Sequence, residues 1–442
     1  MNRREFMLAA GALGGAALFP KTSAAAIPAV EAGEADVIVA GGGPAGLATA
    51  VTFARLGKKV RLFEAHGALG GIWTTGLLSC IIDFDRSPLT KEITARLDKL
   101  GARVPRREKM LDSNYLYEPE YMKFICEELC REAGVVFQLH TSVVAVEKSG
   151  RDITAVFTES KSGRQRWRAP LFVDATGDGD LAARAGCGFD CGGANPGDPD
   201  QPASLIAMAY AEDDAPLARF TVNDPCVFGP AGQTLFNAKK EFLLELRRVG
   251  VEPSYSAPTL FRLRPHLYAI MANHEYGVAV DDAAAQTAAT VRARRELMLM
   301  AMALVGKGGK AWQGFRLLAT AEQLGNRGAR RIHGRYKLTR EDVLAGAQFP
   351  DAVAECGFCM DIHTTRYAER KDGVVVTAPA APRGRVQPVY QIPLRACQAA
   401  DVNNLYMVGR CISGDFAAQS SYRITGAAVG MGEGLAKALV RI

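Results

Sequence analysis

Three glycines and one acid near the start of the chain have the spacing of a dinucleotide-binding turn. The stretch VIVAGGGPAG, residues 37–46, is typical of a buried strand that runs into Gly41, Gly43 and Gly46. The first glycine permits the tight bend, the second lets the backbone approach a pyrophosphate, and the third lets helix and strand pack closely. Glu64 ends the next predicted strand, where an acid accepts hydrogen bonds from a ribose diol and repels a 2′-phosphate. The motif predicts an adenosine dinucleotide, NAD or FAD, and disfavours NADP.

The segments that follow the acid favour FAD over NAD. GGIWTTG places Gly71, Trp73 and Thr74 where flavoproteins of the glutathione-reductase style turn the chain back along the dinucleotide. DATGD, residues 174–178, closes a predicted β-meander in the way that an Ala-Thr-Gly does beside FAD in that style. Near the C-terminus a strand, NLYMVGR, returns toward the cofactor. A helix that begins near Thr425 then aims its N-terminus at the pyrimidine edge, where it stabilises negative charge on a reduced flavin.

Together these motifs resemble the FAD-dependent oxidoreductase family of GGxWT type, a branch of the glutathione-reductase-like flavoproteins. The resemblance covers most of the chain and is carried by GGGPAG, GALGGIWTTGLLS, DATGDGDLAARAG, LGNRGARRIHGRYKLTREDVLAGAQFPDAVAECGFCMDIH, YQIPLRAC, and NNLYMVGRCIS with a later Arg423. It implies an FAD-dependent dehydrogenase or oxidase. The residues that it implies along FAD are Gly41, Gly43, Gly46, Glu64, Gly71, Trp73, Thr74, Asp178 and Arg410.

The contact to the ribityl chain has two candidates. Flavoproteins of the wider class usually end the last strand in Gly-Asp, with the aspartate on the ribityl chain. Here Gly409 is followed by Arg410, and a Gly-Asp pair comes five residues later, at Asp415. Arg410 and Asp415 are therefore both predicted near the cofactor.

Four side chains in the middle of the chain are candidates for substrate chemistry. Arg327, in the stretch LGNRGARRIHGRY, is a candidate clamp for a carboxylate-bearing substrate, since guanidinium forks match carboxylates. The other interpretation is that the arginines of this stretch are solvated or hold structural carboxylates. His333 in the same stretch, His363 in the strand-like CMDIH and His274 in ANHEYG are candidate general acids or bases. A lone histidine on a partly apolar strand is, however, more often a hydrogen-bonded core residue.

The fold that must position these residues is α/β, with a Rossmann-like FAD-binding domain of glutathione-reductase type and an inserted α+β substrate domain. The 442 residues are enough for two closely joined domains. We expect a signal peptide over 1–26, a linker over 27–34, the FAD-binding domain over 34–200 and 383–442, and the substrate domain over 201–382. VGKGGKA follows a predicted long helix rather than a strand, so it indicates a helix end and not a second dinucleotide site.

The composition argues against several classes of partner. The chain is 48% hydrophobic and 23% charged, and its net charge of +6 is spread over scattered basic residues, which argues against nucleic acid. No apolar run beyond the N-terminal segment is long enough to span a bilayer. Close cysteine pairs, such as Cys356 with Cys359, could form disulfides in an oxidising compartment. Without supporting histidines they are weak evidence for a metal site, and no metal is expected.

The N-terminal segment resembles a twin-arginine export signal. Arg3 and Arg4 precede a weakly apolar, Gly/Ala-rich run, and Ala24 to Ala26 offer small residues to a signal peptidase. The alternative is a merely basic, apolar N-terminus. We expect the Tat translocase as a partner during export, and a periplasmic or secreted enzyme.

The sequence thus predicts an exported flavoenzyme that moves a hydride between a small polar metabolite and flavin N5, with oxidation favoured. Electrons would leave to oxygen or a periplasmic carrier, because no second strand–glycine–helix unit is present for NAD(P)H. One alternative is a reductase of an activated double bond, fed by a periplasmic electron donor. The other is a non-catalytic flavin electron carrier.

Overall fold

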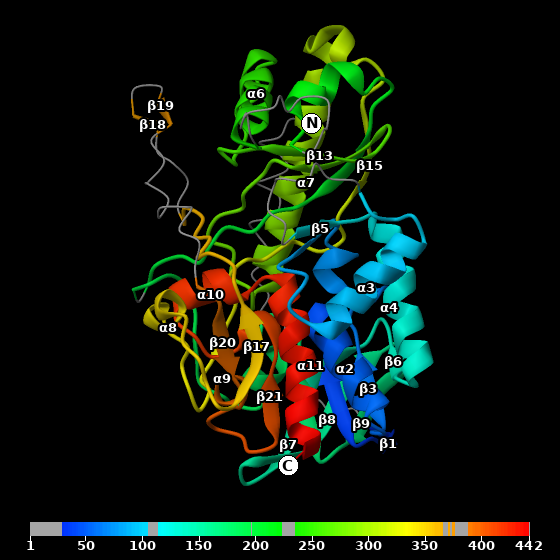
Figure 1. The fold of residues 1–442 in the computed structure, drawn as a ribbon, viewed down its shortest axis with the longest axis vertical. Helices are drawn as coiled ribbons and strands as arrows, with labels where there is room; N and C mark the ends of the chain where they lie inside the picture. Colours follow the sequence, from blue (N-terminus) through cyan, green and yellow to red (C-terminus); the bar gives the residue numbers. More distant parts are fainter. Residues whose placement is uncertain are drawn as a thin grey trace, which may run out of the picture.

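The computed structural model describes residues 29–104, 114–195, 197–222, 235–365, 370–371, 374–375 and 388–441. The described chain forms two lobes (Figure 1). The lower lobe in that view holds a parallel sheet, and the upper lobe holds an antiparallel sheet with helices α6 and α7. Each lobe has its own apolar core.

The lower lobe is built on a five-stranded parallel sheet in the order β21-β10-β2-β3-β6. Its strands are β2 (Val37–Ala40), β3 (Val60–Phe63), β6 (Val136–Gln138), β10 (Leu171–Asp174) and β21 (Leu405–Met407). Every residue of β2 is buried, as expected for a strand covered on both faces. Helix α2 (Pro44–Arg55) connects β2 to β3 and packs against α11 (Thr425–Arg441). The predicted βαβ unit and the helix that begins at Thr425 are therefore confirmed.

A second, four-stranded sheet of the lower lobe contains the predicted meander. Its strand order is β1-β9-β8-β7. Strand β8 (Asp152–Ser160) pairs antiparallel with β7 (Ser142–Ser149) on one side and with β9 (Gly163–Arg168) on the other. The predicted linker over 27–34 was wrong for its last five residues, because β1 (Val30–Glu34) pairs in parallel with β9. The sequence VEAGE lacks the alternation of apolar and polar residues that predicts a strand. Backbone pairing with an edge strand and the ion pair between Glu31 and Arg166 hold it there instead.

The upper lobe is an antiparallel sheet in the order β13-β14-β12-β15, covered by two helices. The elements are β12 (Ala207–Tyr210), α6 (Leu235–Arg248), β13 (Thr259–Arg264), β14 (Leu267–Met271), α7 (Ala283–Lys307) and β15 (Arg316–Thr320). Helix α7 ends at Lys307, Gly308 is its C-cap residue, and Gly309 follows with φ +72°. VGKGGKA is thus a helix end, as predicted.

The chain leaves the upper lobe earlier than the sequence indicated. Apart from Leu77, Val104 and Leu116, the buried residues of the upper core lie between 203 and 324. Strand β16 (Arg331–Ile332) then pairs with β11 (Phe189–Asp190), and β17 (Ala352–Cys356) pairs with β20 (Tyr390–Pro393), both in the lower lobe. The structure therefore ends the upper lobe near residue 325 rather than at 382. These long-range pairings leave no local mark in the sequence, and the strand-like CMDIH, 359–363, forms no strand.

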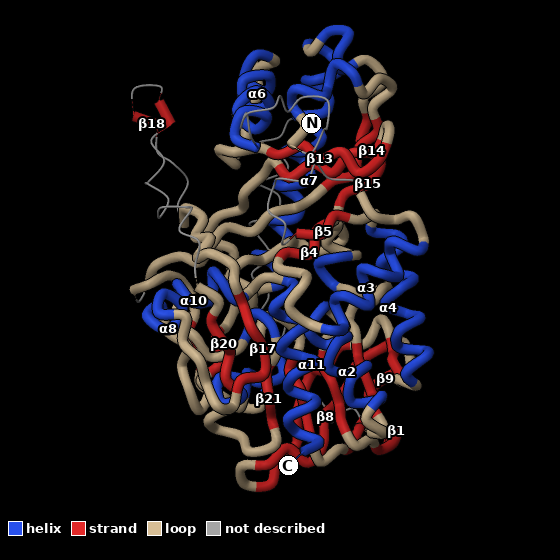
Figure 2. The backbone as a smooth tube through the Cα atoms, viewed as in Figure 1, coloured by secondary structure: helices blue, strands red, loops and turns tan. Residues whose placement is uncertain are grey.

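One short pair of strands lies where the two lobes meet. The β4–β5 pair lies between the upper sheet and the lower lobe (Figure 2). The remaining elements are β4 (Cys80–Ile82), α3 (Pro88–Lys99), β5 (Asn114–Leu116), α4 (Pro119–Ala133), α5 (Asp180–Arg184), α8 (Arg340–Ala345), β18 (Arg370–Lys371), β19 (Val374–Val375), α9 (Leu394–Cys397) and α10 (Phe416–Tyr422). Among the described residues, none of these helices or those of the lobes is long and apolar enough to cross a membrane.

Candidate active site

A cavity of about 1550 Å³ lies between the two lobes. Its lining combines the turn after β2, the segments 175–178, 322–327 and 408–410, and the start of α11. Pockets for drug-sized ligands are usually ~300–1,000 Å³. The cavity therefore has room for a dinucleotide and for a second molecule beside it.

The glycine turn forms one end of this cavity. A Cβ atom at Gly41, where φ is +98°, would lie 2.4 Å from the Ala175 carbonyl oxygen, and one at Gly46 would lie 1.9 Å from the Gly41 carbonyl oxygen. A Cβ atom at Gly43 would meet nothing within 4 Å. Gly41 and Gly46 thus serve close packing, whereas Gly43 faces open space at the start of α2. No side chain caps that helix, so its first N–H groups are available to an anion.

Glu64 is oriented at the same end by two neighbours. Its Oε2 atom accepts a hydrogen bond of 2.6 Å from the Gly42 amide, and its Oε1 atom accepts one of 2.8 Å from the His66 amide. Oε1 also lies 2.7 Å from His66 Nδ1, and this bond to a carboxylate raises the pKa of His66. A buried carboxylate held beside an anion cradle suits the ribose of an adenosine dinucleotide.

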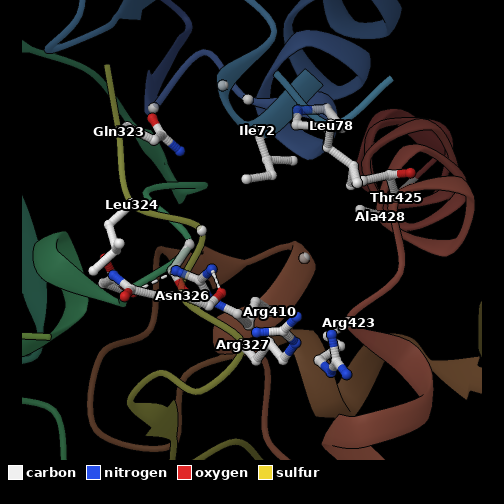
Figure 3. A pocket seen from close by; sticks show the side chains of 18 of the residues that line it. Ile72, Leu78, Gln323, Leu324, Asn326, Arg327, Arg410, Arg423, Thr425 and Ala428 are labelled. Carbon is white, nitrogen blue, oxygen red and sulfur yellow. Dashed lines mark hydrogen bonds and ion pairs between the residues drawn. The ribbon is translucent and has the colours of Figure 1, made fainter. Parts of the chain in front are cut away.

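The opposite end of the cavity offers groups that suit a flavin. Thr425 lines the cavity at the first turn of α11, and within the described part of the chain its buried hydroxyl has no hydrogen-bond partner. Arg410 also lines the cavity (Figure 3). Its Nε atom donates to the Gly177 carbonyl at 3.1 Å, and its two other nitrogens donate to Asp178 and to the Asn326 carbonyl. An orphaned hydroxyl at a helix N-terminus fits the polar edge of a flavin ring.

The predicted cofactor residues do not all line the cavity. Those that do are Gly41, Gly43, Glu64, Gly71, Asp178 and Arg410. Trp73 and Thr74 are fully buried beside it, and the Thr74 hydroxyl donates to the Leu69 carbonyl at 2.6 Å. Asp415 instead caps helix α10, where it accepts from the Ala418 amide at 2.7 Å. Of the two ribityl candidates, only Arg410 reaches the cavity.

Two arginines form a positive region beside Arg410. Arg327 donates from Nη1 to the Pro202 carbonyl at 2.6 Å and to the Ser204 hydroxyl at 2.9 Å. Arg423 donates to the Asp361 carbonyl at 2.9 Å. Both line the cavity, and Figure 3 shows them gathered with Arg410 on one side of it.

The guanidinium groups of this region lie among carboxylates. Arg423 Nη2 is 3.4 Å from Asp361 Oδ2, and Arg410 forms an ion pair with Asp178. Burial and the positive charges of Arg327 and Arg410, opposed by Asp361, lower the pKa of Arg423 to about 10. A carboxylate is a group that such guanidinium forks bind well.

His363 lies beside these arginines with a carboxylate behind it. Its Nε2 atom is 3.1 Å from Asp361 Oδ2. Burial first, and then the charge of Arg327, lowers the pKa of His363 to about 3. The ring is therefore neutral, and with Nε2–H facing Asp361 the lone pair is on Nδ1.

The two other predicted histidines do not line the cavity. His274 stands behind its wall, with its ring centroid 4.0 Å from that of Tyr255 and 5.2 Å from that of His363. His333 is half-exposed, and its Nε2 atom lies 3.0 Å from Asp190 Oδ1. Both histidines therefore lie outside the set of residues that line this cavity.

The arginines that follow residue 326 also differ in whether they line the cavity. Arg330 donates to Asp180 at 2.9 Å, and Arg331 donates to the Gly192 carbonyl at 3.0 Å. Both are tied to the loops that follow β10. Arg327 is the arginine of this stretch that lines the cavity. The structural interpretation describes Arg330 and Arg331, and the clamp interpretation stays a prediction for Arg327.

Sequence reasoning missed several lining residues. Asp361 precedes His363 by two residues in MDIH, so an acid–histidine spacing was visible. Arg423 stood only as a mark of the resemblance. Ile72 lines the cavity from within the GGIWTTG motif, where only its neighbours were predicted, and Tyr255 and Gln323 line it from segments without a motif.

Cysteine, histidine and acidic side chains are the groups that could hold a metal ion, and cysteines could also form disulfides. Within the described ranges, no group of three or more His, Cys, Asp or Glu side chains is placed to hold a metal ion. Cys126 and Cys130 are buried free thiols on α4, and burial raises the pKa of both. Cys356 is a buried thiol as well, and burial raises its pKa to about 11.

The fold and the cavity define a dinucleotide-binding oxidoreductase of the flavoprotein class. The chain belongs to the FAD dependent oxidoreductase family, whose model matches residues 36–440. The protein is accordingly an enzyme, and FAD is its cofactor. The glycine cradle, Glu64 and the orphaned Thr425 hydroxyl fit that cofactor.

Solved structures that match the chain include two monooxygenases and a reductase-like protein. The geranylgeranyl bacteriochlorophyll reductase-like protein of Thermoplasma acidophilum is 13% identical, with a TM-score of 0.46 over 92% of this chain and 77% of that one. The p-nitrophenol 4-monooxygenase of Pseudomonas putida is 13% identical, with a TM-score of 0.42 over 70% and 71%. The flavin-dependent monooxygenase PieE, solved with FAD and substrate, is 13% identical, with a TM-score of 0.44 over 70% and 52%. No curated protein matched the chain.

Proposed function

We propose that this enzyme oxidises an anionic metabolite, with Arg327 and Arg423 binding its carboxylate and His363 accepting the proton. One observation carries the proposal. Both arginines and the His363–Asp361 pair line the same cavity as the glycine turn and Glu64. Bound FAD supplies the hydride acceptor, its N5 atom, and the protein supplies everything else.

The arginines also prepare the base. Burial, and after it the positive charges of Arg327 and Arg423, lowers the pKa of His363. A bound carboxylate offsets part of the arginine contribution, so it moves the pKa of His363 upward. Substrate binding thus makes the histidine a stronger base. Asp361 then stabilises the imidazolium across 3.1 Å.

The same observations favour oxidation over the two alternative functions. A reductase of an activated double bond would use the arginines equally well, but it needs a proton donor, and His363 is neutral with Nε2–H turned toward Asp361. A non-catalytic electron carrier has no use for convergent arginines over its flavin. Oxidation therefore accounts for more of the site.

Anaerobic titration of the purified holoenzyme separates these functions. Loss of the oxidised flavin spectrum on adding a hydroxy or amino acid supports the oxidation. Reoxidation of dithionite-reduced enzyme by an enoate, with no reduction by any acid of the panel, supports the reductase and overturns our proposal. No response to either set supports the carrier.

We also propose that the enzyme is exported by the Tat translocase and passes its electrons to oxygen or a periplasmic carrier. The signal segment over 1–26 lies outside the described residues. Replacing Arg3 and Arg4 together with lysine should retain the protein in the cytoplasm, as fractionation would show. Undiminished export of that variant would end this part of the proposal.

A further inference from the structure

The upper sheet turns an apolar face toward the cavity. Phe261 on β13 lies opposite Ala269 on β14, two residues from Met271. Because side chains alternate along a strand, Phe261 and Met271 share one face of the sheet. Both line the cavity, as does Ile206 just before β12. Leu260, on the other face, is buried in the upper core.

This apolar face begins at the anion site. The Arg327 Nη2 atom lies 4.0 Å from the sulfur of Met271, while Nη1 is bonded to Ser204 at the same end of the sheet. Phe261 stands roughly 7 Å further along, at ~3.4 Å per residue. The order along the cavity wall is therefore guanidinium, thioether and aromatic ring.

Further apolar side chains line the same cavity. Leu78, Ile82 and Leu116 come from the β4–β5 region, and Val222 comes from beside β13, where its amide donates to the Leu260 carbonyl at 3.0 Å. A small polar metabolite bound at Arg327 would leave these side chains facing water. An apolar body attached to the carboxylate would remove them from water, which is the favourable outcome.

We propose that the substrate is an anionic amphiphile, a carboxylic acid whose apolar body lies along Met271 and Phe261. The inference rests on the proposed function, because it takes its anion site from there. It replaces the small polar metabolite expected from the sequence with a longer, apolar acid. Because Arg327 is positively charged, the carboxylate end of the substrate lies beside it.

A series of linear saturated acids tests this without turnover. Acetate, butyrate, hexanoate and octanoate are titrated into the oxidised holoenzyme, and binding is read from the perturbation of the flavin spectrum. We expect Kd to fall about fourfold per added methylene, at ~0.8 kcal/mol for each. Octanol should bind far more weakly than octanoate. Equal affinity across the series, or tighter binding of succinate than of octanoate, would overturn the proposal.

Two variants assign the effect to the sheet. Phe261→Lys should weaken octanoate by at least tenfold, leave acetate unchanged, and tighten octanedioate, whose second carboxylate would meet the new charge. Phe261→Ser should flatten the chain-length series without that gain. Leu318→Ser, at an exposed position of β15 outside the cavity lining, is the matched control and should change nothing. Octanoate binding that survives both Phe261 variants would contradict the assignment.

This outcome is separable from that of the proposed function. If affinity depends on chain length but no hydroxy or amino acid reduces the flavin, the amphiphilic ligand stands and the proposed oxidation fails. If only short polar acids reduce the flavin, the proposed oxidation stands and the amphiphilic substrate fails.

Discussion

The Asp361 carboxylate lies 3.1 Å from Nε2 of His363, and Arg423 donates to the carbonyl of the same aspartate at 2.9 Å. One residue thus links the proposed base to the proposed anion site. Its neighbour Arg327 acts on the same histidine through charge. The site is best understood as one coupled unit.

Replacing His363 with Gln should slow flavin reduction by the substrate about 10²- to 10⁴-fold, the usual contribution of a positioned base. Binding of a saturated acid should change little, because the arginines remain. Stopped-flow reduction and spectral titration give the two numbers. Asp361→Asn should also slow reduction and move the pH profile, because the imidazolium loses its partner. A large loss of acid binding in His363→Gln, with reduction at saturation intact, would remove the histidine from catalysis.

The low pKa of His363 should also appear in stability. Unfolded His363 takes up a proton near pH 6.5, whereas the folded ring does so only near 3. Acidification from pH 6.5 therefore favours the unfolded state, by about 1.4 kcal/mol per pH unit from this group. Between pH 7 and 5 the free energy of unfolding should fall about 2 kcal/mol more in the wild type than in His363→Gln. Urea titrations at both pH values measure it, and equal losses would show that the ring is not buried as described.

Arg327→Gln should raise Kd for a carboxylic acid about 10- to 100-fold, since a charge-assisted hydrogen bond contributes roughly 1.5–3 kcal/mol. It should leave FAD bound. Arg316→Gln is the matched control, because Arg316 lies over the Tyr210 ring and away from the cavity lining. An unchanged Kd in Arg327→Gln, beside an equally unchanged control, would remove Arg327 from the anion site.

The glycine turn offers a comparison within one motif. Gly46→Ala should lower the melting temperature and abolish FAD binding, because its methyl group would lie 1.9 Å from a carbonyl oxygen. Gly43→Ala should fold as well as the wild type, since its methyl group has open space, yet bind FAD more weakly because that space is where the pyrophosphate approaches. Thermal melts of the apoprotein and FAD titrations separate the two effects. Full FAD affinity in a well-folded Gly43→Ala would mean that the pyrophosphate lies elsewhere.

Local patterns predicted the cofactor end of the molecule well. The turn around Gly43, the acid at Glu64 and the helix from Thr425 each depend on a few adjacent residues, so the sequence displays them. Asp415 was a candidate because a Gly-Asp pair is common at the ribityl chain. It became a helix cap because the chain turns into α10 at that point. Local spacing cannot show that competition.

The substrate end was harder to predict because it is assembled from distant segments. Arg327, His363 and Arg423 come from three segments that are far apart in the sequence and meet only in the folded protein. His333 shares a motif with Arg327, yet it points to Asp190 on another surface. The apolar face of Met271 and Phe261 depends on strand register, which side-chain pattern alone left open.

The most direct test is anaerobic titration of the holoenzyme with a 2-hydroxy or 2-amino acid that carries an eight-carbon apolar chain. The account predicts that one equivalent of acid reduces one equivalent of FAD in the wild type, and that Arg327→Gln needs a higher concentration for the same change. If the flavin stays oxidised with every such acid, while the dithionite-reduced enzyme is reoxidised by an enoate, the central claim is contradicted.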